Sequence, residues 1–368
     1  MKIKTTKETL LGGLQTVQNV IGSKALSTIP ILSNVLIACK KQEVELVTTD
    51  LDISIKVSID AVVDAEGSTT LPVKTLSSVV RELQPGDVEI NVDEKNNAVV
   101  TAGASYFKII GMSPDEFPPI PKAEAKFAFS IEQGTFKEML RKTSYAVSTD
   151  ETRYVLNGVL LSFKEGKLSV VATDGRRLAL VETEIEFPKD IQQEMILPIK
   201  AVNELIRTLG SEGPMKIHPH GNQVIFEFGK TQLSSKLVEG KFPDYRQVIP
   251  SQNEYRIAIE REGLLGALRR MSLFASDSGI GTKFAFNKNK LTISINAPDV
   301  GEARETLPIK YTGKEMVVTF NPDFMMDPLK VLTNDEVYME FTNDLGPAVF
   351  KCDMPFLYVL MPIRVKGD

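Results

Sequence analysis

The sequence predicts an α+β fold made of three similar domains, each with antiparallel sheets and one pair of helices. Three observations predict this fold: markers that recur three times, short strands that lead into amphipathic helices, and strands with period-two alternation. The expected domains are residues 1–121, 122–250 and 251–368. Proline-rich segments at 114–122 and 242–250 separate them.

The repeat is visible in three independent markers. The first is an aspartate turn after an apolar run, at Asp50, Asp174 and Asp299, with spacings of 124 and 125 residues. The second is a proline before a helical pattern, at Pro72, Pro198 and Pro322. The third is a strand-then-helix opening, marked by Leu14, Leu140 and Leu268. Agreement of three markers on one period predicts three copies of one structural unit.

Each repeat is expected to contain two strand–helix–strands units. The six expected helical segments are 5–24, 71–84, 132–148, 197–209, 260–275 and 321–332. The second helix of each repeat is expected to begin at its proline, which the first helical turn tolerates. Alternating apolar residues at 159–163 and 168–172 flank the turn KEGK, and this pattern predicts a hairpin.

Composition indicates an ordinary soluble globular protein, with 42% hydrophobic and 25% charged residues. Cys39 and Cys352 stand in no motif, so we expect neither a disulfide framework nor a cysteine zinc site. The N-terminus lacks a secretion signal and no run of 18 apolar residues occurs, which predicts a cytoplasmic protein without a membrane span.

Motifs for catalysis are missing, and we expect neither enzymatic activity nor a cofactor. The sequence has no phosphate-binding glycine loop, no HExxH and no GxSxG. His218 and His220 have no third ligand nearby, so an exposed hairpin turn is favoured over a metal site. Asp174 precedes a glycine, and a turn is favoured over a catalytic carboxylate. Arg176 and Arg177 occur only in the middle repeat.

The charge is distributed unevenly. The formal net charge is −5, which argues weakly against a nucleic-acid binder, yet the six helical segments together carry +4. One interpretation is that these are solvated helix faces. The other is a positive surface for a phosphate backbone. Three similar domains in a row would meet head-to-tail, an arrangement that closes into a ring or extends as a filament.

The chain resembles the β subunit of bacterial DNA polymerase III, the sliding clamp family, over its full length. The resemblance rests on IPILSNVLI (29–37), ETRYVLNGVLL (151–161), VATDGRRLAL (171–180), SKLVEGKFPDYRQVIP (235–250) and YVLMPIRV (358–365). It implies clamp domains with sheets outside and helices lining a homodimeric ring around duplex DNA. It also implies a processivity factor that tethers the replicative polymerase and has no catalytic activity, no metal and no cofactor.

The resemblance further implies a groove between the second and third domains for short peptides of the polymerase, the clamp loader and repair proteins. The matching positions are Leu156, Thr173, Gly175, Arg176, Arg177, Leu178, Pro243, Val248, Asn321, Met361, Pro362, Ile363 and Arg364. Apolar members suit apolar anchors, and arginines suit a polar group or the peptide backbone. We hypothesise that Asp174 shapes the turn that presents Arg176 and Leu178.

Further positions concern DNA and the dimer. The resemblance implies DNA contacts at Lys24, Arg153, Tyr154 and Lys200, and helix position adds Lys74, Lys137, Arg141, Arg207 and Arg269. For the dimer, Phe107 and Ile109 are expected to meet Phe274 and Ala275 of a second chain.

Three positions depart from the family pattern. They are Gln247 in place of a common arginine, the small Ala275, and the charged ending Lys366-Gly367-Asp368. From Ala275 we expect a dimer that dissociates more readily than is typical.

Two rival functions remain open. One is a peptide-binding scaffold that does not encircle DNA. The other is a metal-dependent hydrolase that uses Asp174, which metal-dependent turnover lost in Asp174→Asn would reveal.

Overall fold

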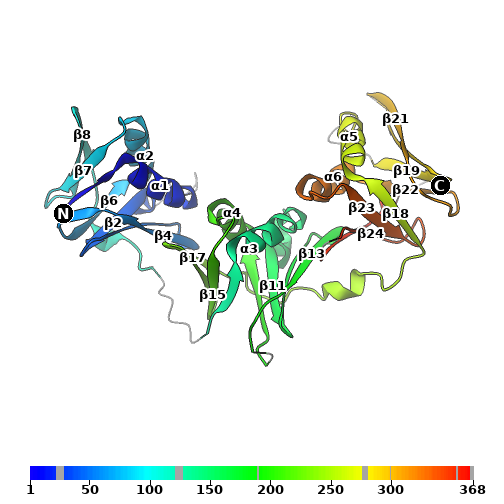
Figure 1. Ribbon diagram of the computed structural model, residues 1–368, viewed down its shortest axis with the longest axis horizontal. Coiled ribbons are helices and arrows are strands. Elements are labelled where there is room, and N and C mark those ends of the chain that lie inside the picture. Colours follow the sequence, from blue (N-terminus) through cyan, green and yellow to red (C-terminus); the bar gives the residue numbers. More distant parts are fainter. Residues whose placement is uncertain are drawn as a thin grey trace. The chain divides into compact units, whose positions relative to one another are not determined.

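The computed structural model describes residues 1–21, 29–120, 127–188, 190–275, 281–298, 300–353 and 355–364. Within these residues the chain has six α-helices and 25 strands (Figure 1). Every strand pair of the described part is antiparallel. The predicted α+β class is therefore confirmed.

The elements follow the predicted repeat. The first repeat contains β1 (Lys2–Thr6), α1 (Lys7–Val17), β2 (Asn34–Lys40), β3 (Glu43–Thr49), β4 (Ile53–Asp60), β5 (Val62–Ala65), β6 (Gly67–Pro72), α2 (Val73–Glu82), β7 (Asp87–Val92), β8 (Asn97–Ala102) and β9 (Ser105–Ile110). The second contains β10 (Phe129–Glu132), α3 (Gln133–Arg141), β11 (Gly158–Lys164), β12 (Lys167–Thr173), β13 (Arg177–Glu184), β14 (Gln193–Pro198), α4 (Ile199–Thr208), β15 (Pro214–His220), β16 (Gln223–Phe228) and β17 (Thr231–Lys236). The third contains β18 (Tyr255–Glu260), α5 (Arg261–Ser272), β19 (Thr282–Asn287), β20 (Lys290–Ala297), β21 (Gly301–Pro308), β22 (Met316–Phe320), α6 (Pro322–Val331), β23 (Glu336–Phe341), β24 (Ala348–Lys351) and β25 (Phe356–Leu360).

Short 3₁₀ helices fill several connections. They are η1 (Gln18–Val20), η2 (Pro30–Ser33), η3 (Pro114–Glu116), η4 (Ser144–Ala146), η5 (Glu151–Leu156) and η6 (Tyr245–Val248). The predicted hairpin is confirmed, since Leu161 pairs with Val170 across β11 and β12. All residues of β11 except Lys164 are buried, so this strand is covered on both faces.

The three repeats share one contact between their helices. The first residue of the first helix donates its backbone N–H to a carbonyl just past the second helix. These bonds run from Lys7 to Gly86 (2.9 Å), from Gln133 to Gly213 (2.9 Å) and from Arg261 to Asp335 (2.8 Å). An unsatisfied N–H at each helix start thus finds a partner, which ties the two helices of a repeat together.

The predicted start of the second helix is correct in only one repeat. Pro322 occupies the first turn of α6, after Asn321, whose side chain accepts from the N–H groups of Asp323 and Phe324. Pro72 and Pro198 instead end β6 and β14, one residue before α2 and α4. A strand end tolerates proline because no further ladder N–H is needed there.

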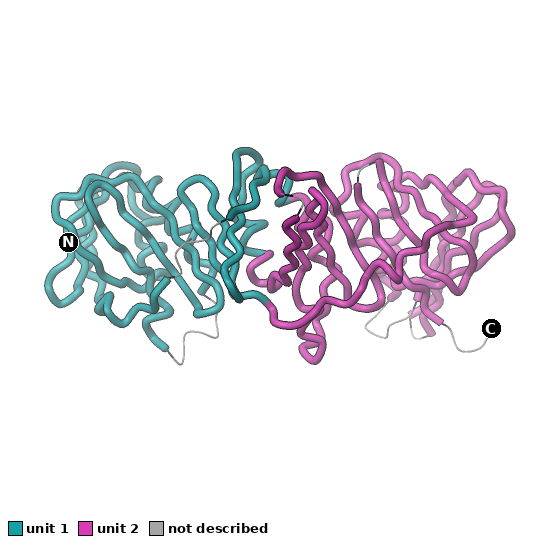
Figure 2. Tube along the Cα trace, turned by 90° about the horizontal axis from the view of Figure 1, so that it is seen from below, with its two compact units in different colours: residues 1–137, 203–237 teal, residues 138–202, 238–368 magenta. Residues whose placement is uncertain are grey.

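The chain divides into two compact units (Figure 2). One contains residues 1–137 and 203–237, and the other contains 138–202 and 238–368. Each unit holds an eight-stranded sheet that joins strands of two repeats. The sheet orders are β10-β15-β16-β17-β4-β3-β2-β6 in the first unit and β14-β11-β12-β13-β25-β24-β23-β18 in the second.

Two strand pairs make these connections. We call the β4–β17 pair and its surroundings the first junction, and the β13–β25 pair and its surroundings the second junction. In the first, Ile55 pairs with Leu233, and in the second, Ala179 pairs with Tyr358. Backbone hydrogen bonds therefore cross from one repeat to the next within each unit.

Candidate functional site

The turn between β12 and β13 is built by Thr173 and Asp174. An Asp174 carboxylate oxygen accepts from the N–H groups of Arg176 (2.8 Å) and Arg177 (3.0 Å). The Thr173 hydroxyl accepts from the N–H of Gly175 (3.1 Å) and donates to the Arg177 carbonyl (2.6 Å). Gly175 has φ +83°, which glycine adopts without strain. The predicted turn is confirmed, and Asp174 is engaged in forming it.

The first repeat has the same turn. Asp50 accepts from the N–H groups of Asp52 (3.1 Å) and Ile53 (2.8 Å). The Thr49 hydroxyl accepts from Leu51 N–H (3.1 Å) and donates to the Ile53 carbonyl (3.0 Å). The third marker of this kind, Asp299, lies outside the described residues.

Arg177 is a buried cation whose donors are all directed at protein oxygens. Its Nε donates to Asp174 (3.0 Å), one terminal nitrogen donates to Asp327 (2.6 Å) and the other to the Tyr145 carbonyl (2.6 Å). The guanidinium also lies 4.0 Å from the centroid of the Phe324 ring. Burial opposes its charge, but nearby Tyr358 and Asp327 outweigh that effect and raise the Arg177 pKa. Arg177 thus braces the turn against α6.

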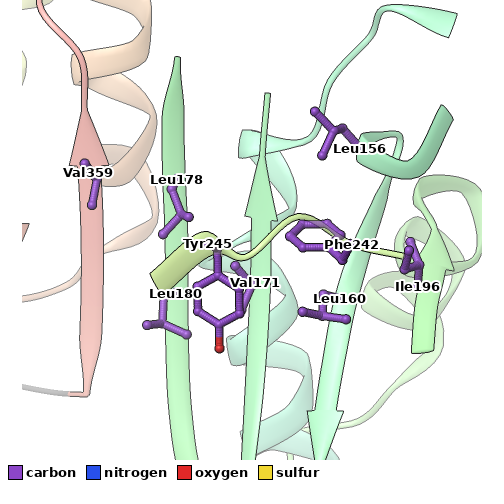
Figure 3. Packing of buried hydrophobic residues seen from close by; sticks show 9 residues of the cluster. All are labelled: Leu156, Leu160, Val171, Leu178, Leu180, Ile196, Phe242, Tyr245 and Val359. Carbon is purple, nitrogen blue, oxygen red and sulfur yellow. The ribbon is translucent and has the colours of Figure 1, made fainter. Parts of the chain in front are cut away.

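A stripe of apolar side chains crosses five neighbouring strands of the second unit (Figure 3). Each strand from β14 to β25 contributes to it. In order the side chains are Ile196, Leu160, Val171, Leu180 with Leu178, and Val359. Leu156 completes the stripe at the end of η5. We call these residues, together with Phe242 and Tyr245, the groove cluster.

The segment that precedes and begins η6 crosses over the stripe. Its Phe242 and Tyr245 are buried against the stripe (Figure 3). Pro243 between them is exposed. Val248 at the end of η6 is 51% exposed and Met361 after β25 is 42% exposed. Large exposed apolar side chains beside a buried apolar stripe are typical of a surface that binds a partner.

The remaining predicted groove residues have mixed environments. The N–H of Met361 donates to the Arg176 carbonyl (2.9 Å), which holds the segment after β25 against the turn. Ile363 N–H donates to Thr319 (2.8 Å). Asn321 is the N-cap of α6, Pro362 is half-buried and Arg364 is exposed. The extension Lys366-Gly367-Asp368 lies outside the described residues.

A polar cavity of about 380 Å³ lies at the same turn. Its lining residues are Val147, Ser148, Thr149, Asp150, Arg153, Asp174, Arg176, Arg177 and Phe324. Burial raises the pKa of the neighbouring Tyr145 hydroxyl well above its ordinary value, so this phenol stays neutral. Leu178 of the groove cluster follows Arg177 of the cavity lining, so the turn has an apolar cluster and a polar cavity next to it.

Several residues of this site were absent from the sequence prediction. Phe242 and Tyr245 lie within the motif SKLVEGKFPDYRQVIP, but their packing could not be inferred from it. Phe324 joins the site through α6, and Val359 joins it through the pairing of β25 with β13. Both depend on contacts between distant parts of the chain.

The basic residues predicted for DNA differ in their availability. Lys137 Nζ donates to the Leu209 carbonyl (2.8 Å), and Arg207 donates to the carbonyls of Gln15 (2.9 Å) and Thr16 (2.6 Å). These two side chains therefore stabilise helix ends. Arg141 pairs with Glu138. Lys74, Arg269 and Tyr154 are exposed, Lys200 is half-buried, and Lys24 lies outside the described residues.

The residues predicted for a dimer lie near two sheet edges. Strand β9 ends the five-stranded sheet of the first unit, and β21 ends the four-stranded sheet of the second. Phe107 on β9 is 36% exposed, whereas Ile109 is only 6% exposed. Phe274 and Ala275 are half-buried after α5. The prediction missed the neighbouring Leu273, which is 77% exposed.

The histidine prediction was wrong in one respect. His218 and His220 lie on β15 and not in a turn, since the turn begins at Gly221. His218 Nε2 lies 2.9 Å from a carboxylate oxygen of Glu227 on the paired strand β16. Among the described residues, no group of three His, Cys, Asp or Glu side chains could hold a metal ion. No helix of that part is long and apolar enough to cross a membrane.

Comparison with known proteins relates all three repeats to one family. The models for the DNA polymerase III beta subunit match residues 1–121 (N-terminal domain), 130–244 (central domain) and 246–364 (C-terminal domain). The beta sliding clamp of Chlamydia muridarum is 33% identical over 368 residues, which cover 100% of both chains. That of Staphylococcus aureus is 32% identical over 357 residues, covering 93% of this chain and 94% of the relative.

Solved structures agree with this relationship. The DNA polymerase sliding clamp of Bacillus subtilis superimposes with a TM-score of 0.94 at 29% identity, covering 99% of each chain. The DNA polymerase III subunit beta of Pseudomonas aeruginosa has a TM-score of 0.94 at 30% identity, covering 99% of this chain and 100% of the other.

Proposed function

This chain belongs to the family of the DNA polymerase III beta subunit, the bacterial sliding clamps, and from that premise we propose that two copies close into a ring around duplex DNA. Its function is that of a sliding clamp in DNA replication. In the proposed ring it tethers the replicative polymerase as a processivity factor. The protein acts in the cytoplasm without catalysis, metal or cofactor, and a separate ATP-driven clamp loader opens the ring.

The domains proposed for this ring are residues 1–121, 122–250 and 251–368. The ring contact joins the β9 edge of one chain to the β21 edge of the other. Two sheet edges without a partner strand among the described residues support this proposal. Phe107 and Phe274 remain proposed contacts, with Leu273 beside them. The expectation of a weak dimer was based on the small Ala275 alone. The exposed Leu273 is a further apolar side chain for the dimer contact, which that expectation did not include.

The DNA contact is sequence-independent and uses the exposed basic side chains of the helices. Lys74, Arg269 and the turn residues Arg153 and Tyr154 are exposed and suit this role. Lys137 and Arg207 are weaker candidates because their donors are engaged with helix carbonyls. Few firm phosphate contacts suit a protein that must move along DNA.

The peptide site is the groove cluster with its exposed rim of Val248 and Met361. The observation that carries this proposal is the apolar stripe across five strands, flanked by exposed apolar side chains. The expected ligands are short linear segments of the polymerase, the clamp loader and other clamp-binding proteins. The apolar anchors of a peptide would pack against this exposed rim, next to the buried stripe.

One experiment tests the ring directly. Solution mass and small-angle scattering on the same sample should give twice 40.7 kDa with a hollow centre in the pair-distance curve. Leu273→Asp should lower the mass towards the monomer, whereas Leu345→Asp, another exposed leucine, should not. A monomer at micromolar concentration would contradict the ring and would favour the scaffold that does not encircle DNA.

A further inference from the structure

A small polar cavity of about 90 Å³ lies at the Asp50 turn of the first junction. Strands β4, β16 and β17 supply part of its lining, and the turn and the segment after η3 supply the rest. The lining residues are Thr49, Leu51, Asp52, Ser54, Pro118, Pro119, Gln223, Ser234, Ser235 and Lys236. All of them belong to the first unit. We call this space the first-junction cavity.

Most hydroxyl groups of this cavity are engaged within the fold. The Thr49 hydroxyl accepts from the Ser54 hydroxyl (2.8 Å) and donates to the Ile53 carbonyl (3.0 Å). The Ser235 hydroxyl donates to the Lys236 carbonyl (2.8 Å). These three hydroxyls therefore stabilise the turn and the strand ends, and offer little to a ligand.

Ser234 and Gln223 differ from them. Ser234 is only 3% exposed, yet its hydroxyl makes no hydrogen bond within the part of the chain that the structure describes. The half-buried side-chain amide of Gln223 likewise has no partner among the described residues. A buried polar group without a partner is costly, and a ligand that pairs with it recovers that cost. The first-junction cavity thus presents two polar groups to an occupant.

The charges of the lining indicate what kind of occupant fits. Its two charged members, Asp52 and Lys236, pair with each other at 3.0 Å, so the lining is neutral. A charged group would lose its water without gaining an opposite charge. An apolar group would leave the Ser234 hydroxyl unpaired.

A neutral group with both donors and acceptors meets both conditions. The carboxamide of an Asn or Gln side chain has two N–H donors and one acceptor oxygen. It is also small enough for a cavity on the scale of a few water molecules.

The rim of the cavity indicates that the carboxamide belongs to a peptide. Leu51 is 46% exposed at the tip of the turn, and Pro119 is exposed on the crossing segment. Apolar side chains around a polar cavity suit a chain that inserts one polar side chain and rests an apolar neighbour on the rim.

We propose that the first junction is a second docking site, which takes a linear peptide segment whose carboxamide side chain pairs with Ser234 and Gln223. This site goes beyond the proposed function, because it lies in the first unit and uses no residue of the groove cluster.

The test uses blocked peptides, acetyl-Ala-Xaa-Leu-methylamide, in which Xaa is Gln, Glu or Met. Each is titrated into the full chain with isotope-labelled isoleucine methyl groups, observed by NMR. Ile225 is fully buried and pairs in register with Ser234, so its methyl signal reports on the first-junction cavity. Ile196 belongs to the groove cluster, and its signal reports separately on the proposed peptide groove.

The Gln peptide should shift the Ile225 signal to saturation. It should bind about tenfold more tightly than the Glu peptide, because the neutral lining offers no partner for a charge. It should bind about three- to tenfold more tightly than the Met peptide, which forms no hydrogen bond through its side chain.

Two variants test the paired groups. Ser234→Ala and Gln223→Met should each weaken the Gln peptide by about fivefold at the Ile225 signal. Ser211→Ala, a matched change of an exposed serine outside the lining, should leave the affinity unchanged. If Ser234→Ala does not fold, Gln223→Met decides the question.

Two results would overturn the inference. One is an Ile225 signal that no peptide shifts to saturation, which would mean that the cavity holds only water. The other is equal affinity for the Gln and Met peptides, or an affinity that neither variant at the cavity changes. An Ile196 signal that no peptide moves would instead count against the proposed peptide groove, and would leave the first-junction site standing.

Discussion

The two junctions share one backbone design but line it with different side chains. In the second junction, residues in register from β14 to β25 are Ile196, Leu160, Val171, Leu180 with Leu178, and Val359. In the first junction, the residues at the same register positions from β6 to β17 are Thr70, Leu36, Val47, Lys56 with Ser54, and Ser234. The apolar stripe thus spans all five strands in the second junction. In the first junction only Leu36 on β2 and Val47 on β3 are apolar at these positions.

The surrounding contacts repeat as well. Lys236 N–H donates to the Asp52 carbonyl (2.9 Å), as Met361 N–H does to Arg176. The small polar cavity there is lined by Asp52, Ser54 and Lys236, and Asp52 pairs with Lys236 at 3.0 Å. The scaffold alone therefore does not determine whether a junction carries an apolar stripe. A few side chains at equivalent register positions decide which junction offers an apolar surface.

The largest expected difference between the junctions concerns Arg177, whose counterpart in the first turn is Ile53. Arg177→Met removes the cation between Asp174 and Asp327 and should lower the free energy of unfolding by about 3 kcal/mol, because Asp174 loses its cation while Lys330 still pairs with Asp327 at 3.1 Å. Urea unfolding followed by tyrosine fluorescence would measure the change. Ile53→Val, the matched control, should cost about 0.5–1.5 kcal/mol. A similar cost for both variants would mean that the buried charges contribute no more than ordinary packing.

The next effect tests whether the stripe binds peptides. Leu178→Ser combined with Met361→Lys copies Ser54 and Lys236 into the second junction. Loss of two apolar contacts should weaken binding of a leucine-containing peptide by about 30-fold or more, as for central interface residues. Ser54→Ala, in the other junction, should leave the affinity unchanged. An unchanged affinity in the double variant would place peptide binding elsewhere on the molecule.

A smaller effect is expected from exchanging the turn residues Gly175 and Leu51. Gly175→Leu places a side chain at φ +83° and about 3.1 Å from an Arg153 nitrogen. A left-handed backbone costs a non-glycine residue about 1–2 kcal/mol, so unfolding should become easier by that amount. Leu51→Gly should change stability by less than about 1 kcal/mol, because relief at φ +78° offsets the added chain entropy. Thermal melts of both variants would show whether Gly175→Leu lowers stability more than Leu51→Gly does.

The last effect appears at alkaline pH and concerns the sheet of the first junction. Burial raises the pKa of Cys39 on β2 from the ordinary 9.0 to about 11. Between these values the unfolded chain loses the proton while the folded chain retains it. Stability from this group is therefore complete below pH 9 and declines as the pH rises towards 11. The unfolding free energy of Cys39→Ala should depend less on pH between 9 and 11 than that of the wild type, and parallel curves would contradict the assignment.

Local pattern and long-range pairing explain what the sequence could predict. The six helices and the β11–β12 hairpin follow from periodicity within short segments, and their presence was confirmed. The expected helical bounds 5–24 and 132–148 were too long, because α1 ends at Val17 and α3 at Arg141, and residues 22–24 lie outside the described part. The pairing of Arg177 with Leu360 joins strands from different repeats, and no local pattern indicates which sheet edge meets which. Without that pairing, the apolar stripe could not be inferred.

The site shows the same limit at the level of single residues. Arg176 and Arg177 are neighbours in one motif, and sequence alone treats them as two similar cations. In the fold Arg176 is exposed, whereas Arg177 is buried and donates to three protein oxygens. His218 was likewise assigned to a turn, because an interruption by proline resembles a loop even though β15 continues through it.

The pairing of β13 with β25 has a consequence for synthesis of the chain. β25 follows every other described strand, so during synthesis β13 is made long before its partner strand β25. Until then β13 presents an unpaired edge, which is an aggregation hazard in a nascent chain. The proposed peptide groove therefore forms only after β25 has been synthesised, and a chain terminated before β25 would fold much of its first unit while offering no such groove to a partner.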